Sequence, residues 1–308
     1  MRAASMARLA VLLSTLVMTS ATASAATGQR VTFSSFDIDP LSGEPLMLSG
    51  LFFTPDASAG GFPAVIALHG CDGMYSALAS RRGSLSARHQ AMADLLVAEG
   101  YAVLFPDSFN PRAQREVCTQ LESKRTILQA HRRLDVLGAL EYLRTRHDIA
   151  TQRVALLGWS HGGSAVLAAI NARSPVIAAY RAQLAPRDAY FVTSIAFYPG
   201  CGASLRGRDG FAPAAPLTIF IGEADDWTSA KPCVALGKAM AAQSPPVEVR
   251  TYADANHGFD APNTLPPRHL DVPNGVVRGH GVTIGSNPAA RADAYARMKG
   301  QLRAALVP

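Results

Sequence analysis

The sequence is poor in cysteine, with only four, and no two of them lie within a few residues of each other. Structural zinc sites usually draw their ligands from closely spaced cysteines and histidines, so the spacing predicts no metal site of that kind. The chain also lacks internal repeats, low-complexity segments and any nucleic-acid-binding motif. With 308 residues, of which 48% are hydrophobic, it is long enough to bury a substantial core and is not expected to be disordered.

The sequence also lacks an apolar run long enough to cross a bilayer. The candidate run, Leu9 to Met18, is too short for a membrane helix. Two arginines precede it and small residues ending at Ala25 follow it, which is the three-part pattern of a secretory signal peptide. We therefore expect residues 1–25 to be cleaved off and residues 26–308 to form an exported protein, periplasmic or secreted, without a stable membrane anchor.

The distribution of charge gives no sign of a nucleic-acid partner. The formal net charge is +6 at pH 7, and the basic residues are spread along the chain. One local cluster, Arg81, Arg82 and Arg88, is interleaved with glycine and serine in an expected loop, where solvated side chains are the simpler interpretation. The pattern therefore predicts no nucleic-acid binding.

Buried strands alternate with helices through most of the chain. Continuous apolar runs, typical of strands covered on both faces, occur at residues 64–68, 102–105, 154–157, 194–198 and 217–221, and a further strand is expected at residues 247–252. Stretches between them repeat apolar residues at helical spacing. Such alternation requires parallel pairing with crossover connections. We therefore predict an α/β fold with a doubly wound, mostly parallel sheet flanked by helices.

Two regions do not follow this alternation of strands and helices. Residues 31–39 and 47–54 are expected to be edge strands joined as a hairpin, because proline, serine and glycine separate them. Residues 262–288 are rich in proline, glycine and asparagine and are expected to form a long irregular loop. No change in composition marks a second domain, so we predict one domain over residues 26–308.

A candidate nucleophile follows the apolar run that ends at Leu157. The sequence Gly158-Trp159-Ser160-His161-Gly162-Gly163 then leads into an Ala-rich, helix-compatible stretch. A strand, a sharp turn and a helix with serine at the apex would place the serine hydroxyl above the sheet, beside a helix N-terminus. The same Gly-Xaa-Ser-Xaa-Gly pattern also occurs in ordinary turns, but this context favours Ser160 as a nucleophile.

A serine nucleophile needs a base, and the base needs an orienting acid. The loop after residues 217–221 contains Asp225 and Asp226, and the loop after residues 247–252 contains His257. The order serine, acid, histidine is that of α/β-hydrolases. We predict His257 as the base and Asp225 as the acid, while Asp226 is the alternative acid or a residue that fixes the loop.

The transition state of acyl transfer also needs two donors for the oxyanion. One is expected from the backbone N–H of His161, the residue after the nucleophile. The other is expected from the loop after residues 64–68, where neighbouring glycines make the Cys71 N–H the best donor. The alternative is that His69-Gly70 merely ends the strand with a turn. His69 itself is interpreted as a residue that braces this loop rather than as a base.

Four cysteines in an exported chain suggest disulfide bonds. In the predicted fold, Cys201 and Cys233 follow strands at the same end of the sheet, and Cys71 and Cys118 follow two earlier strands. We therefore predict the disulfides Cys71–Cys118 and Cys201–Cys233, with free thiols as the alternative for either pair.

Several ordered motifs together resemble the dienelactone hydrolase family of α/β-hydrolases over nearly all of the mature sequence. The matching segments are residues 69–73 (HGCDG), 106–109 (PDSF) with Arg112, 158–163 (GWSHGG), 198–201 (YPGC), 222–227 (GEADDW) and 257–260 (HGFD). The resemblance implies a hydrolase that acts on carboxylic esters or lactones without a metal or organic cofactor. Arg112 could pair with a carboxylate of the protein or of the substrate.

One residue of the matching motifs differs from the family pattern, and this difference narrows the range of expected substrates. The enzymes that name the family use cysteine as the nucleophile, whereas this chain has Ser160. This difference, together with expected export, favours a general serine esterase acting on a small-molecule ester. The alternatives are a peptidase or amidase on the same fold, or a non-catalytic ligand-binding protein.

Overall fold

The computed structural model describes residues 25–56, 61–185, 190–207 and 210–307. The predicted signal peptide lies outside the described residues except for Ala25. In the part of the chain that the structure describes, no helix combines the length and apolar character needed to cross a membrane.

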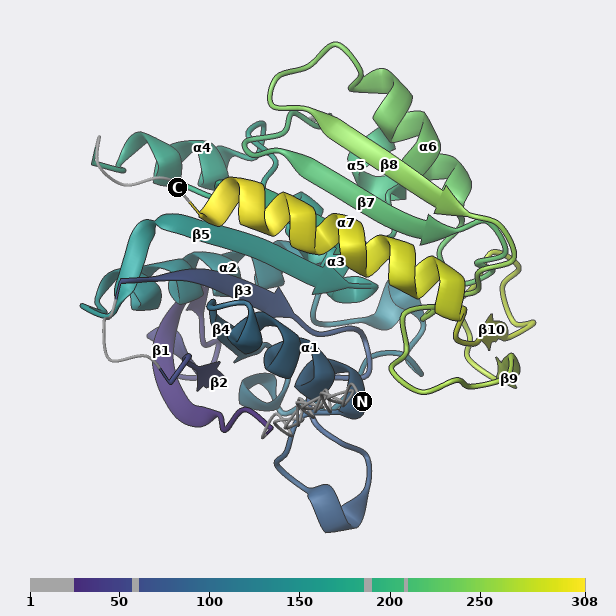
Figure 1. Cartoon of the computed structure of the whole chain (residues 1–308), viewed down its shortest axis with the longest axis horizontal. Helices are drawn as coiled ribbons and strands as arrows, with labels where there is room; N and C mark the ends of the chain where they lie inside the picture. The colour runs from purple at the N-terminus through teal and green to yellow at the C-terminus, as the bar shows by residue number, and fades with distance from the viewer. Residues whose placement is uncertain (1–24, 57–60, 186–189, 208–209, 308) are drawn as a thin grey trace, which may run out of the picture.

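The main sheet has eight strands in the order β1-β2-β4-β3-β5-β6-β7-β8 (Figure 1). The two edge strands β1 and β2 pair antiparallel, as does β2 with β4, and all other pairs are parallel. The predicted mostly parallel α/β sheet is thus confirmed. Its strands are β1 (Gln29–Ile38), β2 (Pro45–Phe53), β3 (Phe62–Leu68), β4 (Ala102–Asp107), β5 (Ile149–Trp159), β6 (Thr193–Phe197), β7 (Leu217–Gly222) and β8 (Val247–Tyr252).

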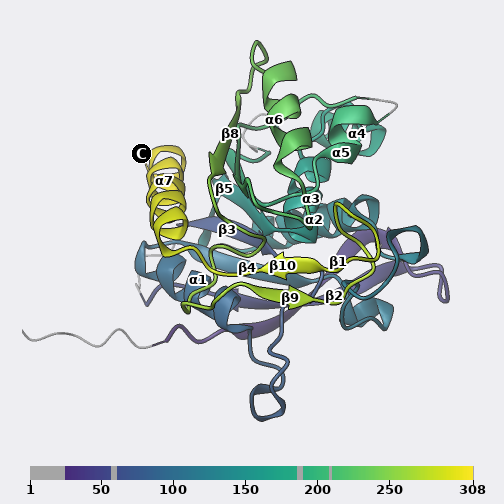
Figure 2. The same cartoon turned by 90° about the vertical axis from the view of Figure 1, so that its right-hand side faces the viewer.

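Helices cover both faces of this sheet. Figure 2 shows α1 and α7 on one side and α2 to α6 on the other. Every residue of β4, β6 and β7 is buried, as expected for strands packed on both faces. The helices are α1 (Ala87–Ala98), α2 (Gln129–Arg144), α3 (His161–Ala169), α4 (Pro175–Ala182), α5 (Gly202–Arg206), α6 (Ala230–Ala239) and α7 (Pro288–Leu306), with short 3₁₀ turns at Ala79–Arg81, Asn110–Arg112 and Glu122–Lys124.

The segment 262–288 differs from the expected irregular loop. It contains β9 (Arg268–Leu270) and β10 (Val282–Ile284), which pair antiparallel as a separate two-stranded sheet. Each strand has only three residues. Strands this short, surrounded by proline and glycine, show no clear alternation of apolar and polar residues, so the sequence pattern could not reveal them.

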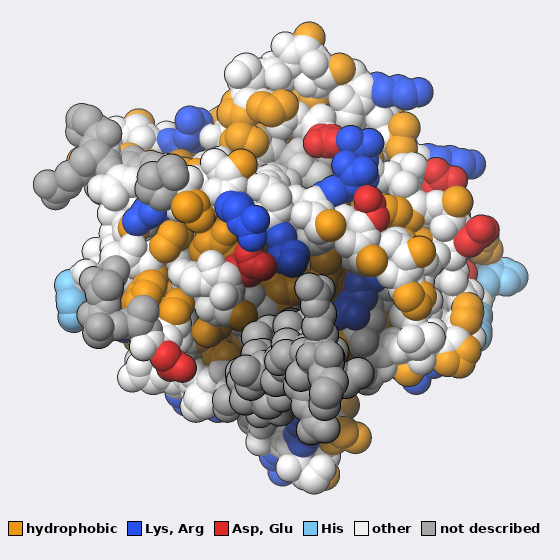
Figure 3. Space-filling model, in the orientation of Figure 1, with side chains coloured by type: hydrophobic (Ala, Val, Ile, Leu, Met, Phe, Trp, Pro, Cys, Tyr) orange, Lys and Arg blue, Asp and Glu red, His pale blue; other side chains and the backbone are white. Residues whose placement is uncertain are grey.

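Charges of both signs are interspersed on the face crossed by α7 (Figure 3). Ion pairs on α7 include Arg297 with Asp293 at 2.7 Å and Arg303 with Glu99, which follows α1, at 3.0 Å. Exposed pairs of this kind contribute little to stability, but they balance the charge of this face locally.

The topology brings several loops to one edge of the sheet. Because β3 to β8 run parallel, the loops at their carboxyl ends lie at the same edge, where the arrowheads of β5, β7 and β8 point in Figure 1. In doubly wound sheets this edge is where ligands bind.

Candidate active site

Ser160 lies at a strained turn between β5 and α3. Its backbone has φ 52° and ψ −116°, a conformation that residues with a Cβ rarely adopt. A Cβ on Gly158 would lie 2.5 Å from the Gly162 carbonyl oxygen, and one on Gly162 would lie 2.2 Å from the Leu68 carbonyl oxygen. Both glycines are therefore required for the close approach of strand and helix, which leaves the serine at the apex.

His257 and Asp225 form a buried hydrogen-bonded pair. The distance between His257 Nδ1 and Asp225 Oδ2 is 2.8 Å, and both residues are 5% exposed. The other carboxylate oxygen of Asp225 accepts hydrogen bonds from the backbone N–H groups of Trp227 at 2.9 Å and Thr228 at 2.8 Å. These donors hold the carboxylate in one orientation, so the imidazole is oriented in turn.

Thr228 is a member of this group that sequence reasoning missed. Its hydroxyl lies 3.0 Å from Asp225 Oδ2, 3.1 Å from His257 Nδ1 and 3.0 Å from the Tyr198 carbonyl oxygen. The rings of Tyr198 and Trp227 lie against the imidazole, with centroid distances of 4.5 and 4.9 Å. The available sequence signal was a threonine three residues after Asp225, the expected acid.

Asp226 faces the opposite way from its neighbour Asp225. Its carboxylate accepts from the Thr283 N–H of β10 at 2.8 Å, and its carbonyl oxygen accepts from the Val276 N–H at 2.7 Å. Asp225 is thus the aspartate that contacts His257, whereas Asp226 joins its loop to the β9–β10 hairpin.

Ser160 and His257 line the same cavity, which has a volume of about 580 Å³. Among the described residues, no hydrogen bond joins their side chains. Such bonds are often long or poorly aligned without substrate and shorten when it binds. Trp159 and Trp227 also line this cavity. Phe109 is fully buried against His69 and His161.

The loop after β3 presents the Cys71 amide beside Ser160. The His69 imidazole accepts from the Ser108 N–H through Nε2, at 3.3 Å, so its proton is on Nδ1, which donates to the Gly70 carbonyl oxygen at 2.8 Å. In a trans peptide the N–H points opposite to the C=O. The imidazole therefore fixes the direction of the Cys71 N–H, which, like the His161 N–H, donates to no other described group.

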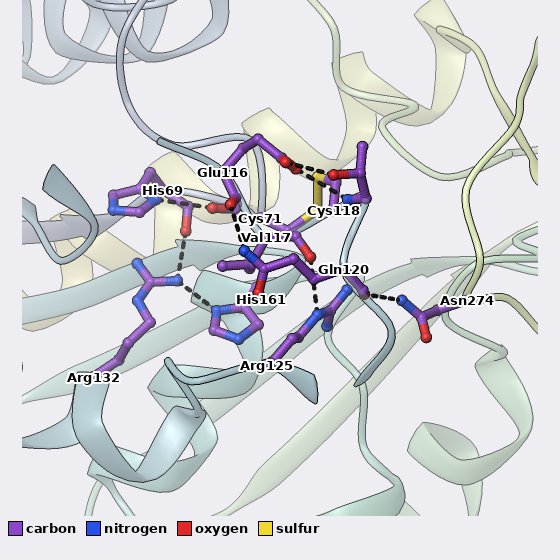
Figure 4. The surroundings of a disulfide bond; sticks show 12 residues. His69, Cys71, Glu116, Val117, Cys118, Gln120, Arg125, Arg132, His161 and Asn274 are labelled. Atoms are coloured by element: carbon purple, nitrogen blue, oxygen red, sulfur yellow. Dashed lines mark hydrogen bonds between the residues drawn. A yellow bond between two sulfur atoms is a disulfide. The ribbon is translucent and has the colours of Figure 1, made fainter. Parts of the chain in front are cut away.

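Arg132 of α2 supports both candidate oxyanion donors and was not foreseen. Its Nη1 donates to the His69 carbonyl oxygen at 2.8 Å and to His161 Nδ1 at 3.0 Å (Figure 4). The side chain is fully buried, and burial lowers its pKa to about 10. Burial and the nearby Arg132 also hold the pKa values of His69 and His161 well below the usual range, so both imidazoles are neutral.

The structure contains the disulfides Cys71–Cys118 and Cys201–Cys233, the two pairs expected from the sequence. The first lies at the cavity wall, and Val117 N–H also donates to the Cys71 carbonyl oxygen at 2.8 Å (Figure 4). The second lies in the main core, where both half-cystines are no more than 1% exposed.

Arg112 has a structural partner rather than a place in the cavity. Its guanidinium contacts Asp37 at 2.6 Å and Asp135 at 2.8 Å. Of the two alternatives left by the sequence, a protein carboxylate is the one that the structure shows.

Asp260 is a buried carboxylate that sequence reasoning did not assign. It accepts from Trp159 Nε1 at 2.8 Å and from the Tyr198 hydroxyl at 2.6 Å, and it pairs with Arg88 at 3.1 Å. Because Trp159 precedes Ser160 and Asp260 follows His257, this carboxylate joins the two loops that carry the serine and the histidine. No group of residues suited to hold a metal ion occurs in the described part of the chain.

The model of the dienelactone hydrolase family matches residues 48–306. A search of curated proteins finds no match. Solved structures with a similar fold include a putative dienelactone hydrolase from Klebsiella pneumoniae, with 16% identity, TM-score 0.58, and coverage of 89% of this chain and 98% of that one.

Two further structures share the fold. The dienelactone hydrolase-like promiscuous phosphotriesterase P91 from metagenomic libraries has 16% identity and TM-score 0.63, covering 91% of this chain and 99% of its own. Thermogutta terrifontis esterase 2, phosphoramylated by tabun, has 15% identity and TM-score 0.56, covering 92% of this chain and 98% of its own. The family match over most of the sequence, on an α/β-hydrolase fold with a serine at the strand-to-helix turn, shows that this chain belongs to the dienelactone hydrolase family.

Proposed function

We propose that this protein is a serine hydrolase that cleaves carboxylic esters or lactones, with Ser160 as nucleophile, His257 as base and Asp225 as the orienting acid. The observation that carries the proposal is the buried 2.8 Å contact between Asp225 and His257 in a cavity that Ser160 also lines. A serine at a strained turn, an imidazole and a fixed carboxylate are the three groups that this chemistry needs.

The reaction proceeds through an acyl-enzyme. His257 removes the proton from the Ser160 hydroxyl as its oxygen attacks the ester carbonyl carbon, and Asp225 stabilises the imidazolium that forms. The tetrahedral intermediate collapses, the C–O bond to the alcohol breaks, and His257 gives its proton to the departing alkoxide. Water then attacks the acyl-enzyme with His257 again as base, which releases the acid and restores Ser160.

The backbone N–H groups of Cys71 and His161 are proposed to hold the oxyanion. The orientation of the Cys71 amide by His69, and the position of His161 at the N-terminus of α3, support these roles. Each donor of this type typically contributes about 3 kcal/mol to stabilising the transition state.

Export is proposed from two observations. The N-terminal pattern fits a signal peptide, and the two disulfides indicate an oxidising environment outside the cytoplasm.

The test is hydrolysis of p-nitrophenyl acetate by residues 26–308. We expect Ser160→Ala to lower kcat at least about 10⁴-fold, since removal of a triad serine leaves only binding and the oxyanion donors. The matched control is Ser164→Ala, one turn further along α3, which should retain activity within about tenfold. Activity that survives Ser160→Ala would overturn the assignment.

A further inference from the structure

The cavity beside Ser160 has one wall that is mostly apolar. This wall belongs to the segment between His257 and α7, and we call its apolar residues the hairpin wall. The residues of the hairpin wall are Ala261, Pro262, Leu265, Leu270, Val272 and Ile284. Trp227 continues the apolar surface toward the catalytic loops. An apolar surface that remains exposed inside a cavity indicates an apolar ligand, because binding removes that surface from water.

The hairpin wall is attached to the two loops that carry the proposed acid and base. Asp226 accepts from the Thr283 N–H at 2.8 Å, and the Gly285 N–H donates to the His257 carbonyl oxygen at 3.3 Å. Leu265 is held by its backbone, since its N–H donates to Ser286 Oγ at 2.6 Å and its C=O accepts from the Ser286 N–H at 3.1 Å. These hydrogen bonds therefore fix the position of the hairpin wall relative to the loops that carry Asp225 and His257.

Of the charged Asp and Arg side chains that line this cavity, Arg88 is paired, and Asp72, Arg268 and Asp271 are exposed. Arg88 pairs with the buried Asp260 at 3.1 Å. Arg268 and Asp271, which have opposite charges, lie on the exposed hairpin. A neutral apolar group thus fits this cavity better than a charged one.

A second, smaller cavity is also lined by Ser160. It has a volume of about 270 Å³, and its lining includes Arg125, Gln129 and Asn274. His257 lines the larger cavity but not the smaller one. The two arms of an ester extend to opposite sides of the carbonyl carbon, so the two cavities would receive different arms.

The position of His257 decides which arm enters which cavity. In the proposed reaction His257 delivers a proton to the departing alkoxide, so the alcohol oxygen must lie beside His257. The alcohol arm then extends along the hairpin wall. We propose that the substrates are esters of large apolar alcohols with a short acyl group, an inference that rests on the proposed function and adds the substrate class to it.

The experiment measures kcat/KM of residues 26–308 for two series of esters by titration of the released acid. One series is alkyl acetates from methyl to hexyl, and the other is methyl esters from acetate to hexanoate. We expect kcat/KM to rise about threefold per methylene in the alcohol series, on the order of a hundredfold in all, because each buried methylene favours binding. We expect no such rise in the acyl series. The ratio kcat/KM reports acylation, whereas kcat can be set by hydrolysis of the common acetyl-enzyme.

Paired variants test the role of the wall. Leu265 is 43% exposed and Val277, in the same segment but outside the cavity, is 57% exposed. Leu265→Asp should reduce the preference for hexyl over methyl acetate about tenfold, and Val277→Asp should leave it unchanged. Circular dichroism spectra and thermal unfolding of both variants report correct folding.

The outcomes separate this inference from the proposed function. A flat alcohol series, a rise only in the acyl series, or an unchanged preference in Leu265→Asp would overturn the inference while acetate hydrolysis continued. Loss of all Ser160-dependent ester hydrolysis would overturn the proposed function and this inference together.

Discussion

The two sides of Ser160 are held in place by different means. On one side, the segment His69 to Gly73 is joined to Val117 and Cys118 by a backbone hydrogen bond and a disulfide, and the buried Arg132 of α2 donates to the His69 carbonyl oxygen. On the other side, Asp225 contacts His257 at 2.8 Å, and the carboxylates of Asp226 and Asp260 join the two loops to β10 and to Trp159. We call these the oxyanion side and the acid–base side.

The two sides are held by different restraints because they position different kinds of chemical group. The proposed oxyanion donors are backbone N–H groups, which move only if the peptide moves, so covalent and backbone restraints hold them. The acid and base are side chains with rotatable bonds, so hydrogen bonds to their polar atoms must select one rotamer. Removing the disulfide should therefore displace a backbone donor on the oxyanion side, whereas removing a carboxylate should free a side chain to rotate on the acid–base side.

The largest expected effect is on the acid–base side. Asp225→Asn should lower kcat for p-nitrophenyl acetate by about 10³- to 10⁴-fold, because an amide cannot stabilise the imidazolium and favours the wrong tautomer of His257. Asp226→Asn is the matched control, because its amide oxygen can still accept from the Thr283 N–H. It should remain within about tenfold of wild type. The reverse ranking of the two variants would refute the assignment of the acid.

An intermediate effect is expected on the oxyanion side. Replacing Cys71 and Cys118 by serine should lower kcat by about 10- to 100-fold with little change in KM, because a displaced Cys71 amide loses part of its contact with the oxyanion. Replacing Cys201 and Cys233 by serine should change kcat less than about threefold, because that disulfide lies in the main core.

Stability alone would not separate these two disulfide variants. The disulfides close segments separated by 47 and 32 residues, and segment length enters the chain-entropy estimate only as a logarithm, so each contributes about 4 kcal/mol. Equal losses of kcat in the two variants, at temperatures where both are folded, would show that the oxyanion side has no special dependence on its disulfide.

The smallest effect is a pH dependence that also belongs to the oxyanion side. Burial keeps His161 neutral in the folded chain by lowering its pKa, whereas the unfolded chain takes up a proton near pH 6.5. The unfolded state therefore binds more protons as pH falls, and the stability present above about pH 6.5 is lost below it. The cost is about 1 kcal/mol for His161 between pH 6.5 and pH 5.5.

Denaturant unfolding at these two pH values measures this cost. His161→Asn should lose about 1 kcal/mol less than wild type on acidification, and the exposed His280→Asn should behave as wild type. An identical pH dependence in His161→Asn and wild type would show that this imidazole is not the source.

Local patterns account for what the sequence could predict. Apolar runs marked the buried strands, and the turn around Ser160 has glycines that only a close approach of strand and helix explains. Asp225 and His257 lie in loops directly after β7 and β8, so parallel topology alone brings them to one edge. The other residues of the site are brought together by contacts between segments that are far apart in the sequence.

The groups that sequence reasoning missed depend on contacts between distant segments. Arg132 meets the His69 carbonyl oxygen across 63 positions in the chain, and Asp260 meets Trp159 across 101 positions. Each of these residues lies in a segment whose local pattern is that of an ordinary helix or turn. The hairpin that joins Asp226 to the cavity wall is similarly defined by pairing, not by composition.

The assignment of Ser160 as the nucleophile is tested most directly by locating a covalent adduct on the protein. Residues 26–308 would be treated with a fluorophosphonate, digested and mapped by mass spectrometry, with His257→Ala treated in parallel. We expect a single phosphonyl adduct on Ser160 in the wild type and strongly slowed labelling in His257→Ala. An adduct on another residue, or labelling that is equally fast without His257, would contradict it.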